Sequence, residues 1–230
     1  MEIDRSAVDE LIQFSTPSVL NGLKRLGVHP AHLQSLDRLA IRCTSPALGR
    51  RVGFAATRKV ATSTEGPTKA PSSPSRRADE HILTVPEPRI LVAENVGDWK
   101  GPVCIWGEVT ANLYVAMGCT GGVTNGPVRD IDEMESVGFQ TFASGAGVGG
   151  GFVDVLEVGE PVEVGGVTIA AGDLIHADRH GVIKVPTELV AALPDAIRAV
   201  EEKERKVIEV CRSAQFSLDA FASAWSSDPR

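Results

Sequence analysis

The chain has 230 residues, of which 43% are hydrophobic and 23% are charged. This composition is globular and excludes wholesale disorder and collagen-like repeats. The net charge of -7 disfavours nucleic acid and anionic membranes as partners, and no apolar run approaches the ~18 residues of a membrane helix.

Residues 6–27 are predicted to be helical, because Ser15-Thr16-Pro17 supplies a hydroxyl cap followed by proline in the first turn. Gly27 is expected to end this helix. Arg51–Thr57 has the pattern of a strand. Residues 62–77 are rich in Ser, Thr, Pro and Gly without an apolar period, so we expect a mobile surface loop rather than a domain boundary.

A series of short apolar segments follows, most of them bounded by Gly, Pro or Asp, which predicts strands. These segments are Ile90–Ala93, Val103–Trp106, Gly122–Thr124, Gln140–Ala143, Val162–Val164, Val167–Ala170, Leu174–Ala177 and Val182–Val185. Helices are predicted over 108–118 and 130–137, and residues 187–225 are expected to form a C-terminal helical tail. We therefore predict one α/β domain spanning 1–230.

The sequence of residues 145–150, GAGVGG, formally satisfies the dinucleotide-binding pattern G-x-G-x-x-G. That motif requires a helix directly afterwards, whose N-terminus holds the pyrophosphate. Phe152-Val153-Asp154-Val155 follows instead and has the pattern of a strand. A plain loop is therefore favoured over a nucleotide site.

The candidate catalytic and ligand-binding residues lie between Gly101 and Glu135. The predicted strand Val103–Trp106 ends at Gly107-Glu108, and Arg129-Asp130 open the second predicted helix. Strand ends that lead into helices collect ligands in α/β sheets. An arginine binds carboxylates in a forked geometry, and an aspartate oxygen suits Mg²⁺. The alternative from spacing alone is a surface ion pair at a capped helix.

This stretch resembles the RraA-like family, which includes class II 4-hydroxy-4-methyl-2-oxoglutarate / 4-carboxy-4-hydroxy-2-oxoadipate aldolases and regulators of ribonuclease E activity. The family pattern is a Gly-acid pair, twenty residues, Arg-Asp, two residues and an acid. Gly107-Glu108, Arg129-Asp130 and Glu133 match this spacing. Glu108 stands where these aldolases often have Asp, and Asn21 and Asn125 also replace the usual Asp.

The resemblance implies a role for each matched position. Asp130 would bind Mg²⁺ or Mn²⁺, Arg129 would contact the keto acid, and backbone amides of Gly107, Glu108, Val109 and Thr110 would hold the substrate carboxylate. Glu108 would place a water that acts as base, and Glu133 would assist through metal-bound water. The implied fold is a compact α/β/β sandwich of the swivelling type, assembled as trimers or dimers of trimers with active sites at subunit contacts.

The tail carries an apolar stripe at helical spacing that contains one carboxylate. The stripe consists of Leu193, Ile197, Val200, Val207 and Cys211, and Glu204 lies within it. A carboxylate on a buried face is costly unless it is paired. Glu204 therefore either swings to solvent or, as the family would supply, enters the metal site of an adjacent subunit, with Glu201 and Glu202 as alternatives in register.

Two further features complete the sequence reading. His176, Asp178 and His180 have a spacing that suggests a metal site, but Asp178 is more simply explained as a turn residue. The acidic N-terminus MEIDRSAVDE lacks the regions of a signal peptide. The four cysteines are widely separated, so we expect a cytoplasmic protein with free thiols.

The resemblance implies a divalent-metal-dependent lyase that cleaves a C–C bond of a 2-keto acid and releases pyruvate, with oxaloacetate decarboxylation as a side activity. The alternative is a non-catalytic oligomeric regulator that binds ribonuclease E or another protein.

Overall fold

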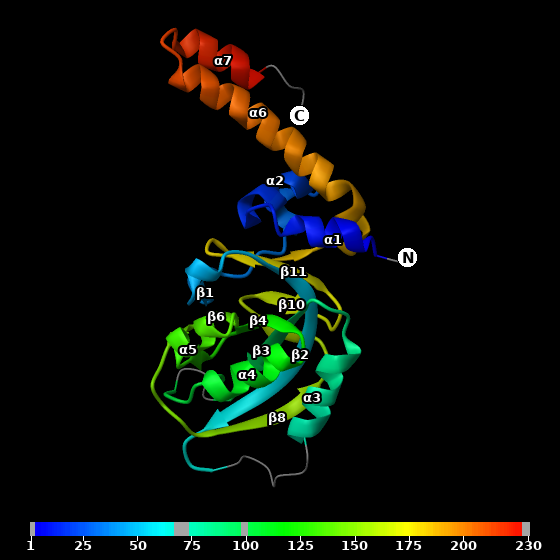
Figure 1. Cartoon of the computed structure of the whole chain (residues 1–230), viewed down its shortest axis with the longest axis vertical. Helices are drawn as coiled ribbons and strands as arrows, with labels where there is room; N and C mark the ends of the chain where they lie inside the picture. Colours follow the sequence, from blue (N-terminus) through cyan, green and yellow to red (C-terminus); the bar gives the residue numbers. More distant parts are fainter. Residues whose placement is uncertain (1–2, 67–73, 98–100, 227–230) are drawn as a thin grey trace. The chain divides into compact units, whose positions relative to one another are not determined.

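A computed structural model describes residues 3–66, 74–97 and 101–226. The chain divides into two compact units, of which one comprises Met1–Leu33 and Glu188–Arg230 and the other Gln34–Thr187 (Figure 1). The single domain over 1–230 stays a prediction. Among the described residues, no helix combines the length and apolar character needed to span a membrane.

The unit that contains both ends of the chain is helical. Its helices are α1 (Arg5–Leu11), α2 (Thr16–Arg25), η1 (Pro30–His32), η3 (Thr187–Ala192, which begins one residue before the unit), α6 (Leu193–Arg212) and α7 (Leu218–Ser226). Ser15 caps α2 as predicted, because its side chain accepts the Ser18 N–H at 3.2 Å. The single helix predicted over 6–27 is wrong, since a cap residue takes extended backbone and Ser15 thereby separates α1 from α2.

The predicted helical tail is present as η3, α6 and α7, and α6 packs against α2 within this unit. Gly22 makes the close approach possible, because a Cβ at this position would lie 2.9 Å from Leu193 Cδ1. The apolar stripe is buried at Leu193, Ile197 and Val207, whereas Cys211 is exposed. The stripe therefore covers the core only along part of α6.

The other unit is built on an eight-stranded mixed sheet in the order β1-β6-β4-β3-β2-β11-β12, with β8 paired to β2. Its strands are β1 (Arg42–Cys43), β2 (Arg51–Ser63), β3 (Arg89–Asn95), β4 (Cys119–Thr124), β6 (Gln140–Ala143), β8 (Phe152–Val158), β11 (Leu174–Asp178) and β12 (Gly181–Val185). Strands β2, β3, β4 and β6 are mutually parallel and form its centre, while the other four pair antiparallel.

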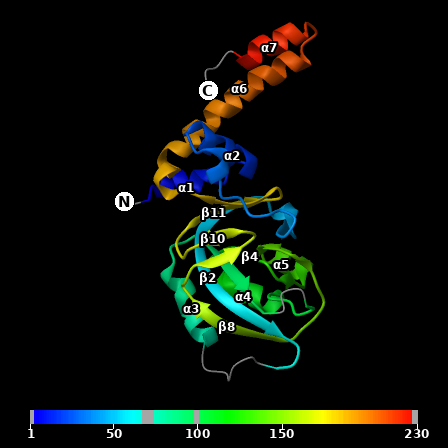
Figure 2. The ribbon, with the colours of Figure 1, turned by 180° about the vertical axis from the view of Figure 1, so that it is seen from behind.

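Two layers cover the sheet. The antiparallel hairpin of β9 (Val162–Val164) and β10 (Val167–Ile169) shares an apolar core with one face, including Ile90 and Val92 (Figure 2). On the other face, Gly122 leaves room for Trp106 and Phe139. On this face Trp106 lies edge-on to Tyr114 of the helix α4 (Glu108–Ala116), and Phe139 is tilted against the same ring. The elements outside the sheet and the hairpin are η2 (Pro46–Leu48), α3 (Pro74–Thr84), α4 (Glu108–Ala116), α5 (Ile131–Ser136), β5 (Pro127–Val128) and β7 (Gly145–Ala146).

The central strands β2 and β3 are buried at nearly every position, because one layer covers each face of the sheet. The predicted α/β/β sandwich is confirmed in this layering. Figure 1 and Figure 2 both place α3 beside β8 at one end of the sheet.

Two predictions about this unit are wrong. Val103–Trp106 is buried but is not a ladder strand, because only Val103 forms a bridge, to Gly149. The loop predicted over 62–77 begins inside β2 and ends inside α3. The Thr62 N–H donates to Asn95 Oδ1 at 3.3 Å, so a polar residue is held in the sheet by side-chain bonding that composition does not reveal. The central part of that loop, 67–73, lies outside the described residues.

Candidate functional site

The first helix of the candidate site, α4, begins at Glu108 with Gly107 as its N-cap. Thr110 Oγ1 accepts the Gly107 N–H at 3.1 Å and donates to the Gly107 carbonyl at 2.9 Å. The Glu108 N–H donates to Asp130 Oδ2 at 3.1 Å. This bond closes the gap of twenty residues and brings both halves of the sequence motif together.

Asp130 is the N-cap residue of α5 and adopts a left-handed conformation with φ 54° and ψ 46°. It is the only described residue other than glycine with positive φ. Such a conformation costs about 1–3 kcal/mol and persists where surrounding structure holds it, often at functional sites. Here the Glu108 amide holds the carboxylate.

Arg129 lies directly beside this carboxylate, with its Nε 3.4 Å from Asp130 Oδ2. The Arg129 N–H donates to the Trp106 carbonyl at 3.0 Å, which ties β5 and the residue after it to the segment before α4. The side chains of Arg129 and Asp130 are 46% and 37% exposed. The predicted ion pair therefore exists, and both of its members remain accessible to a ligand.

Position 107 requires a glycine, because the side chains of Asp130 and Arg129 lie close to its Cα atom. A Cβ at position 107 would overlap Asp130 Oδ2 and would lie 3.2 Å from both Cγ and Nε of Arg129. Any side chain at this position would displace the carboxylate or the guanidinium.

The glycine-rich segment that the sequence analysis treated as a plain loop also approaches Arg129. The strand predicted after this segment is confirmed as β8. A Cβ at Gly150 would lie 3.4 Å from Arg129 Nη1, and the Gly149 carbonyl accepts the Cys104 N–H at 3.1 Å. The many glycines of this segment are the sequence signal that its backbone passes close to another group, here the Arg129 guanidinium.

Cys104 is buried behind this loop and beside the charged pair. Burial raises the pKa of its thiol, while the Gly149 backbone bond and the charge of Arg129 act in the opposite direction. The raised pKa favours the protonated thiol, which is the less nucleophilic form. All four cysteines are free thiols.

Asp130 is suited to hold a divalent cation together with water. No hydrogen bond among the described residues reaches its Oδ1 atom, whereas Oδ2 is held by Glu108 and Arg129. Mg²⁺ accepts one or two carboxylates and keeps several waters. The part of the chain that the structure describes contains no group of three acidic, Cys or His side chains able to hold a metal together, so direct ligation would fall to Asp130.

The other predicted groups of the site are placed as follows. The side chains of Glu108 and Glu133 are exposed on the first turns of α4 and α5, and their role through metal-bound water stays a prediction. The amides of Gly107 and Glu108 already have acceptors inside the protein. The next two amides, of Val109 and Thr110, have none among the described residues.

Asn125 has a structural reason to differ from the usual Asp of the family. Its Nδ2 donates to the Asn95 carbonyl at 3.0 Å, and its Oδ1 accepts the Asn95 N–H at 2.7 Å. An aspartate could accept but not donate at physiological pH. Through these two hydrogen bonds, the Asn125 side chain links the end of β4 to the end of β3.

Glu204 is exposed on α6, within the helical unit, and the Asn21 amide lies 3.5 Å from its Oε1. The exposure of its side chain agrees with the alternative in which Glu204 reaches solvent, because the stripe around it is only partly covered. Glu202 pairs with Arg205 and Lys206 in the same helix, and Glu201 is exposed. It stays a prediction that one of these three glutamates enters the metal site of an adjacent subunit.

Of the alternative cluster, His176 lies within β11, and Asp178 and His180 lie at the turn between β11 and β12. Asp178 Oδ1 accepts the His180 N–H at 2.8 Å between β11 and β12. Asp178 therefore shapes this turn, as the sequence favoured.

The family description RraA-like (Aldolase/RraA) matches residues 22–184, more than half of the chain and the whole candidate motif. The chain belongs to the RraA-like family. This membership confirms the resemblance seen in Gly107-Glu108 and Arg129-Asp130.

Curated relatives match parts of the chain. Protein DlpA of Legionella pneumophila is 29% identical over 136 residues, which cover 57% of this chain and 22% of that protein. A protein of Halalkalibacterium halodurans named as a 4-hydroxy-4-methyl-2-oxoglutarate aldolase is 28% identical over 98 residues, covering 42% of this chain and 46% of that protein. The chain thus spans less than half the length of these two relatives.

Solved structures confirm the RraA-like fold over nearly the whole chain. An uncharacterized protein of Pseudomonas syringae pv. tomato has a TM-score of 0.75 at 27% identity, covering 97% of this chain and 96% of that chain. RraAS2 of Streptomyces coelicolor, described as an unusual member of the RNase ES inhibitor RraA family, has a TM-score of 0.69 at 20% identity. The match covers 89% of this chain and 96% of that chain.

Proposed function

We propose that this protein is a divalent-metal-dependent lyase that cleaves a C–C bond of a 2-keto acid and releases pyruvate. The proposed substrate is of the 4-hydroxy-4-methyl-2-oxoglutarate type, and oxaloacetate decarboxylation is a side activity, because loss of CO₂ from oxaloacetate produces the same pyruvate enolate. The observation that carries this proposal is the bond from the Glu108 amide to Asp130 Oδ2, beside the Arg129 guanidinium.

Arg129 and the start of α4 would bind and orient the keto acid. The guanidinium presents donors in a fork that matches a carboxylate or a keto oxygen. The amides of Val109 and Thr110 open the nine-residue helix α4, where a substrate carboxylate is favoured. Asp130 would place Mg²⁺ or Mn²⁺, which supplies Lewis-acid stabilisation of enolate charge.

Glu108 is the proposed positioning group for proton transfer. Its side chain is exposed directly after the amide that holds Asp130. From there it would orient the water that takes the proton from the 4-hydroxyl group as the C–C bond breaks. Arg129 stabilises the negative charge that develops on the three-carbon fragment.

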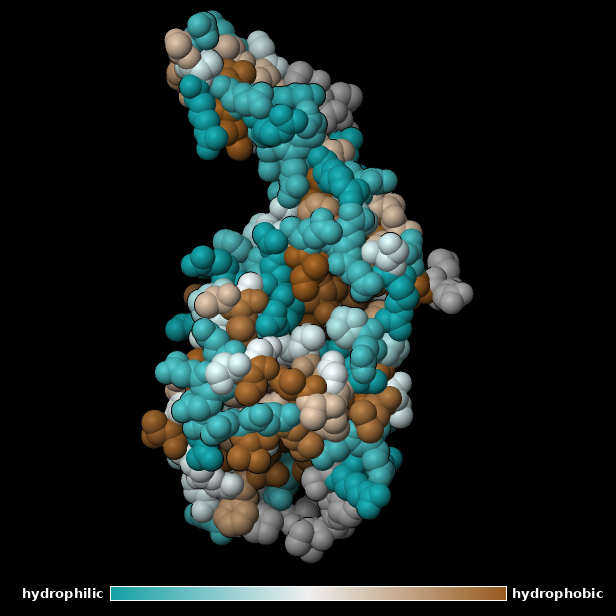
Figure 3. Space-filling view, viewed as in Figure 1, coloured by the Kyte–Doolittle hydropathy of each residue, from teal (hydrophilic) through white to brown (hydrophobic). Residues whose placement is uncertain are grey.

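Assembly into trimers or dimers of trimers in the cytoplasm is part of the proposal. Apolar side chains are exposed on the unit that contains the site, including Val109 (82%), Val148 (95%) and Phe152 (46%). Figure 3 shows such exposed apolar groups over the unit that contains α4. Subunit contact would cover them, and Glu204, or Glu201 or Glu202, would then come from the adjacent subunit.

The test is pyruvate release from oxaloacetate and from 4-hydroxy-4-methyl-2-oxoglutarate in the presence of Mg²⁺. Asp130→Ala and EDTA should each abolish release, whereas Asp132→Ala, which removes an exposed carboxylate from the same helix, should retain it. Unchanged release in Asp130→Ala or in EDTA would refute the proposal. Absence of release from the folded wild-type protein, together with capture of ribonuclease E, would favour the non-catalytic regulator.

A further inference from the structure

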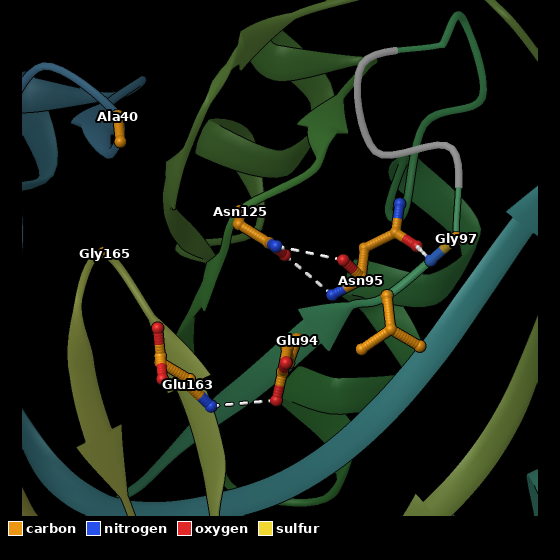
Figure 4. Close-up of a pocket in the computed structure, with 8 residues that line it drawn as sticks. Ala40, Glu94, Asn95, Gly97, Asn125, Glu163 and Gly165 are labelled. Carbon is orange, nitrogen blue, oxygen red and sulfur yellow. Dashed lines mark hydrogen bonds between the residues drawn. The ribbon is translucent and has the colours of Figure 1, made fainter.

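A cavity lies on the other side of the sheet from the Arg129–Asp130 pair. It has a volume of about 400 Å³ and opens where β3 ends, between the β9–β10 hairpin and the end of β4 (Figure 4). Its lining residues are Ala40, Glu94, Asn95, Val96, Gly97, Asn125, Glu163 and Gly165. The carboxyl ends of parallel strands are the usual position of ligand sites in α/β sheets.

The alternation of side chains along β3 shows that the cavity is separate from the candidate active site. The side chain of Glu94 lies on the same face of β3 as those of Ile90 and Val92, because alternate residues of a strand share a face. Ile90 and Val92 belong to the core shared with the hairpin. Trp106, directly before Gly107, packs over Gly122 on the opposite, helical face. The cavity and the proposed lyase site therefore occupy different faces of one sheet edge.

Two carboxylates border the cavity, from β3 and β9, as Figure 4 shows. Glu94 Oε2 accepts the Glu163 N–H at 2.8 Å, which fixes the position of this carboxylate and of β9. Neither the Oε1 atom of Glu94 nor the carboxylate of Glu163 has a hydrogen-bond or ion-pair partner among the described residues.

The charge of the cavity is not balanced by its own lining, which contains no Lys or Arg within the described part of the chain. Lys59 lies across from Glu94 in the neighbouring strand, but its Nζ pairs with Glu157 Oε2 at 2.9 Å. Lys59 thus weakens the negative potential near Glu94 without occupying the acceptor positions of the cavity.

The polar wall beside the carboxylates is rigid. Asn125 and the Asn95 backbone hold each other through two bonds, and Asn95 Oδ1 accepts the Gly97 N–H at 3.0 Å. Asn125 Oδ1 retains a second lone pair after these bonds. The cavity therefore offers fixed acceptor oxygens, a condition that favours a ligand rich in N–H donors.

We propose that this cavity binds a small organic cation, a primary alkylammonium or guanidinium compound, between Glu94 and Glu163. Charge-assisted hydrogen bonds from nitrogen to carboxylate are short and strong, and the volume lies within the range of small-molecule sites. A divalent metal ion is the competing occupant of these two glutamates, and comparing Mg²⁺ with the organic cation separates the two.

The test is calorimetric titration of the full-length protein with butane-1,4-diamine, with butane-1,4-diol as the neutral analogue. Glu163→Gln and Glu94→Gln should each weaken diamine binding about tenfold, because each removes one charge-assisted acceptor. Glu94→Gln preserves a carbonyl oxygen for the Glu163 amide, so the hairpin should stay in place. Glu160→Gln makes the same charge change at an exposed position outside the lining and should have no effect.

Asp130→Asn should also leave diamine binding unchanged, which separates this cavity from the proposed lyase site. Heat from the diamine but not the diol, lost in the two cavity variants and kept in the other two, supports the proposal. Absence of diamine binding at millimolar concentration, equal weakening by Glu160→Gln, or stronger binding of Mg²⁺ than of the diamine at these glutamates would overturn it.

Discussion

Replacing Gly107 with alanine tests whether the position of the Asp130 carboxylate governs the proposed activity. The added Cβ would overlap Asp130 Oδ2 and would lie 3.2 Å from Arg129 Nε. The carboxylate would have to move by about 1 Å to restore van der Waals separation, and its bond to the Glu108 amide at 3.1 Å would break. A displacement of about 1 Å costs about 100-fold in rate at a site that depends on orientation.

The assay for Gly107→Ala is Mg²⁺-dependent pyruvate release, with thermal unfolding measured in parallel. We expect a loss of about 100-fold in kcat/KM and a decrease of only about 1 kcal/mol in the free energy of unfolding, since one solvent-accessible hydrogen bond is lost. Gly150→Ala is the matched control, because its Cβ would make an ordinary contact of 3.4 Å with Arg129 Nη1. Near-wild-type activity in Gly107→Ala would refute the reasoning.

Three further predictions concern groups away from the site. Burial lowers the pKa of His81, and Arg58 lowers it further. Below about pH 6.5 the unfolded chain therefore binds a proton at this side chain more readily than the folded protein does. From pH 7 to pH 5 the wild type should therefore lose more stability to urea than His81→Gln; equal losses would contradict this. Tyr114→Phe removes the acceptor for Arg58 Nη1 at 3.2 Å and should lower the free energy of unfolding by about 1.5–3 kcal/mol, whereas an unchanged urea midpoint would oppose it. Burial raises the pKa of Cys119 to about 11, so iodoacetamide at pH 8 should label exposed Cys211 first, as mass spectrometry would show; equal rates would disprove it.

Much of the fold could be predicted because the signals are local. Ser15 caps α2 since a serine hydroxyl before proline satisfies a first-turn amide, and the short apolar segments from β3 to β12 match the observed strands in all but one case. The exception is Val103–Trp106, whose apolar residues reflect burial in the core and not pairing in a sheet. Its partners are isolated groups, as in the bond from the Ile105 N–H to the Pro127 carbonyl at 2.8 Å, and a burial pattern cannot distinguish these from a ladder.

The candidate site was predictable in its residues but not in its geometry. Spacing alone left Arg129-Asp130 as either a ligand site or a surface ion pair, and only the tertiary bond from the Glu108 amide joins the two halves. The left-handed backbone of Asp130 could not be predicted, because aspartate can adopt this conformation but does so only occasionally. The approach of Gly150 to Arg129 likewise depends on the fold of a distant loop.

The central claim is that Asp130 and Arg129 act together on a metal-bound keto acid. A crystal structure of the protein soaked with pyruvate and Mn²⁺, with anomalous scattering used to locate the metal, tests this most directly. We predict an anomalous peak in contact with an Asp130 carboxylate oxygen and the pyruvate carboxylate or keto oxygen within hydrogen-bond distance of Arg129. Pyruvate and Mn²⁺ bound elsewhere, with Arg129 and Asp130 contacting only each other, would contradict the account.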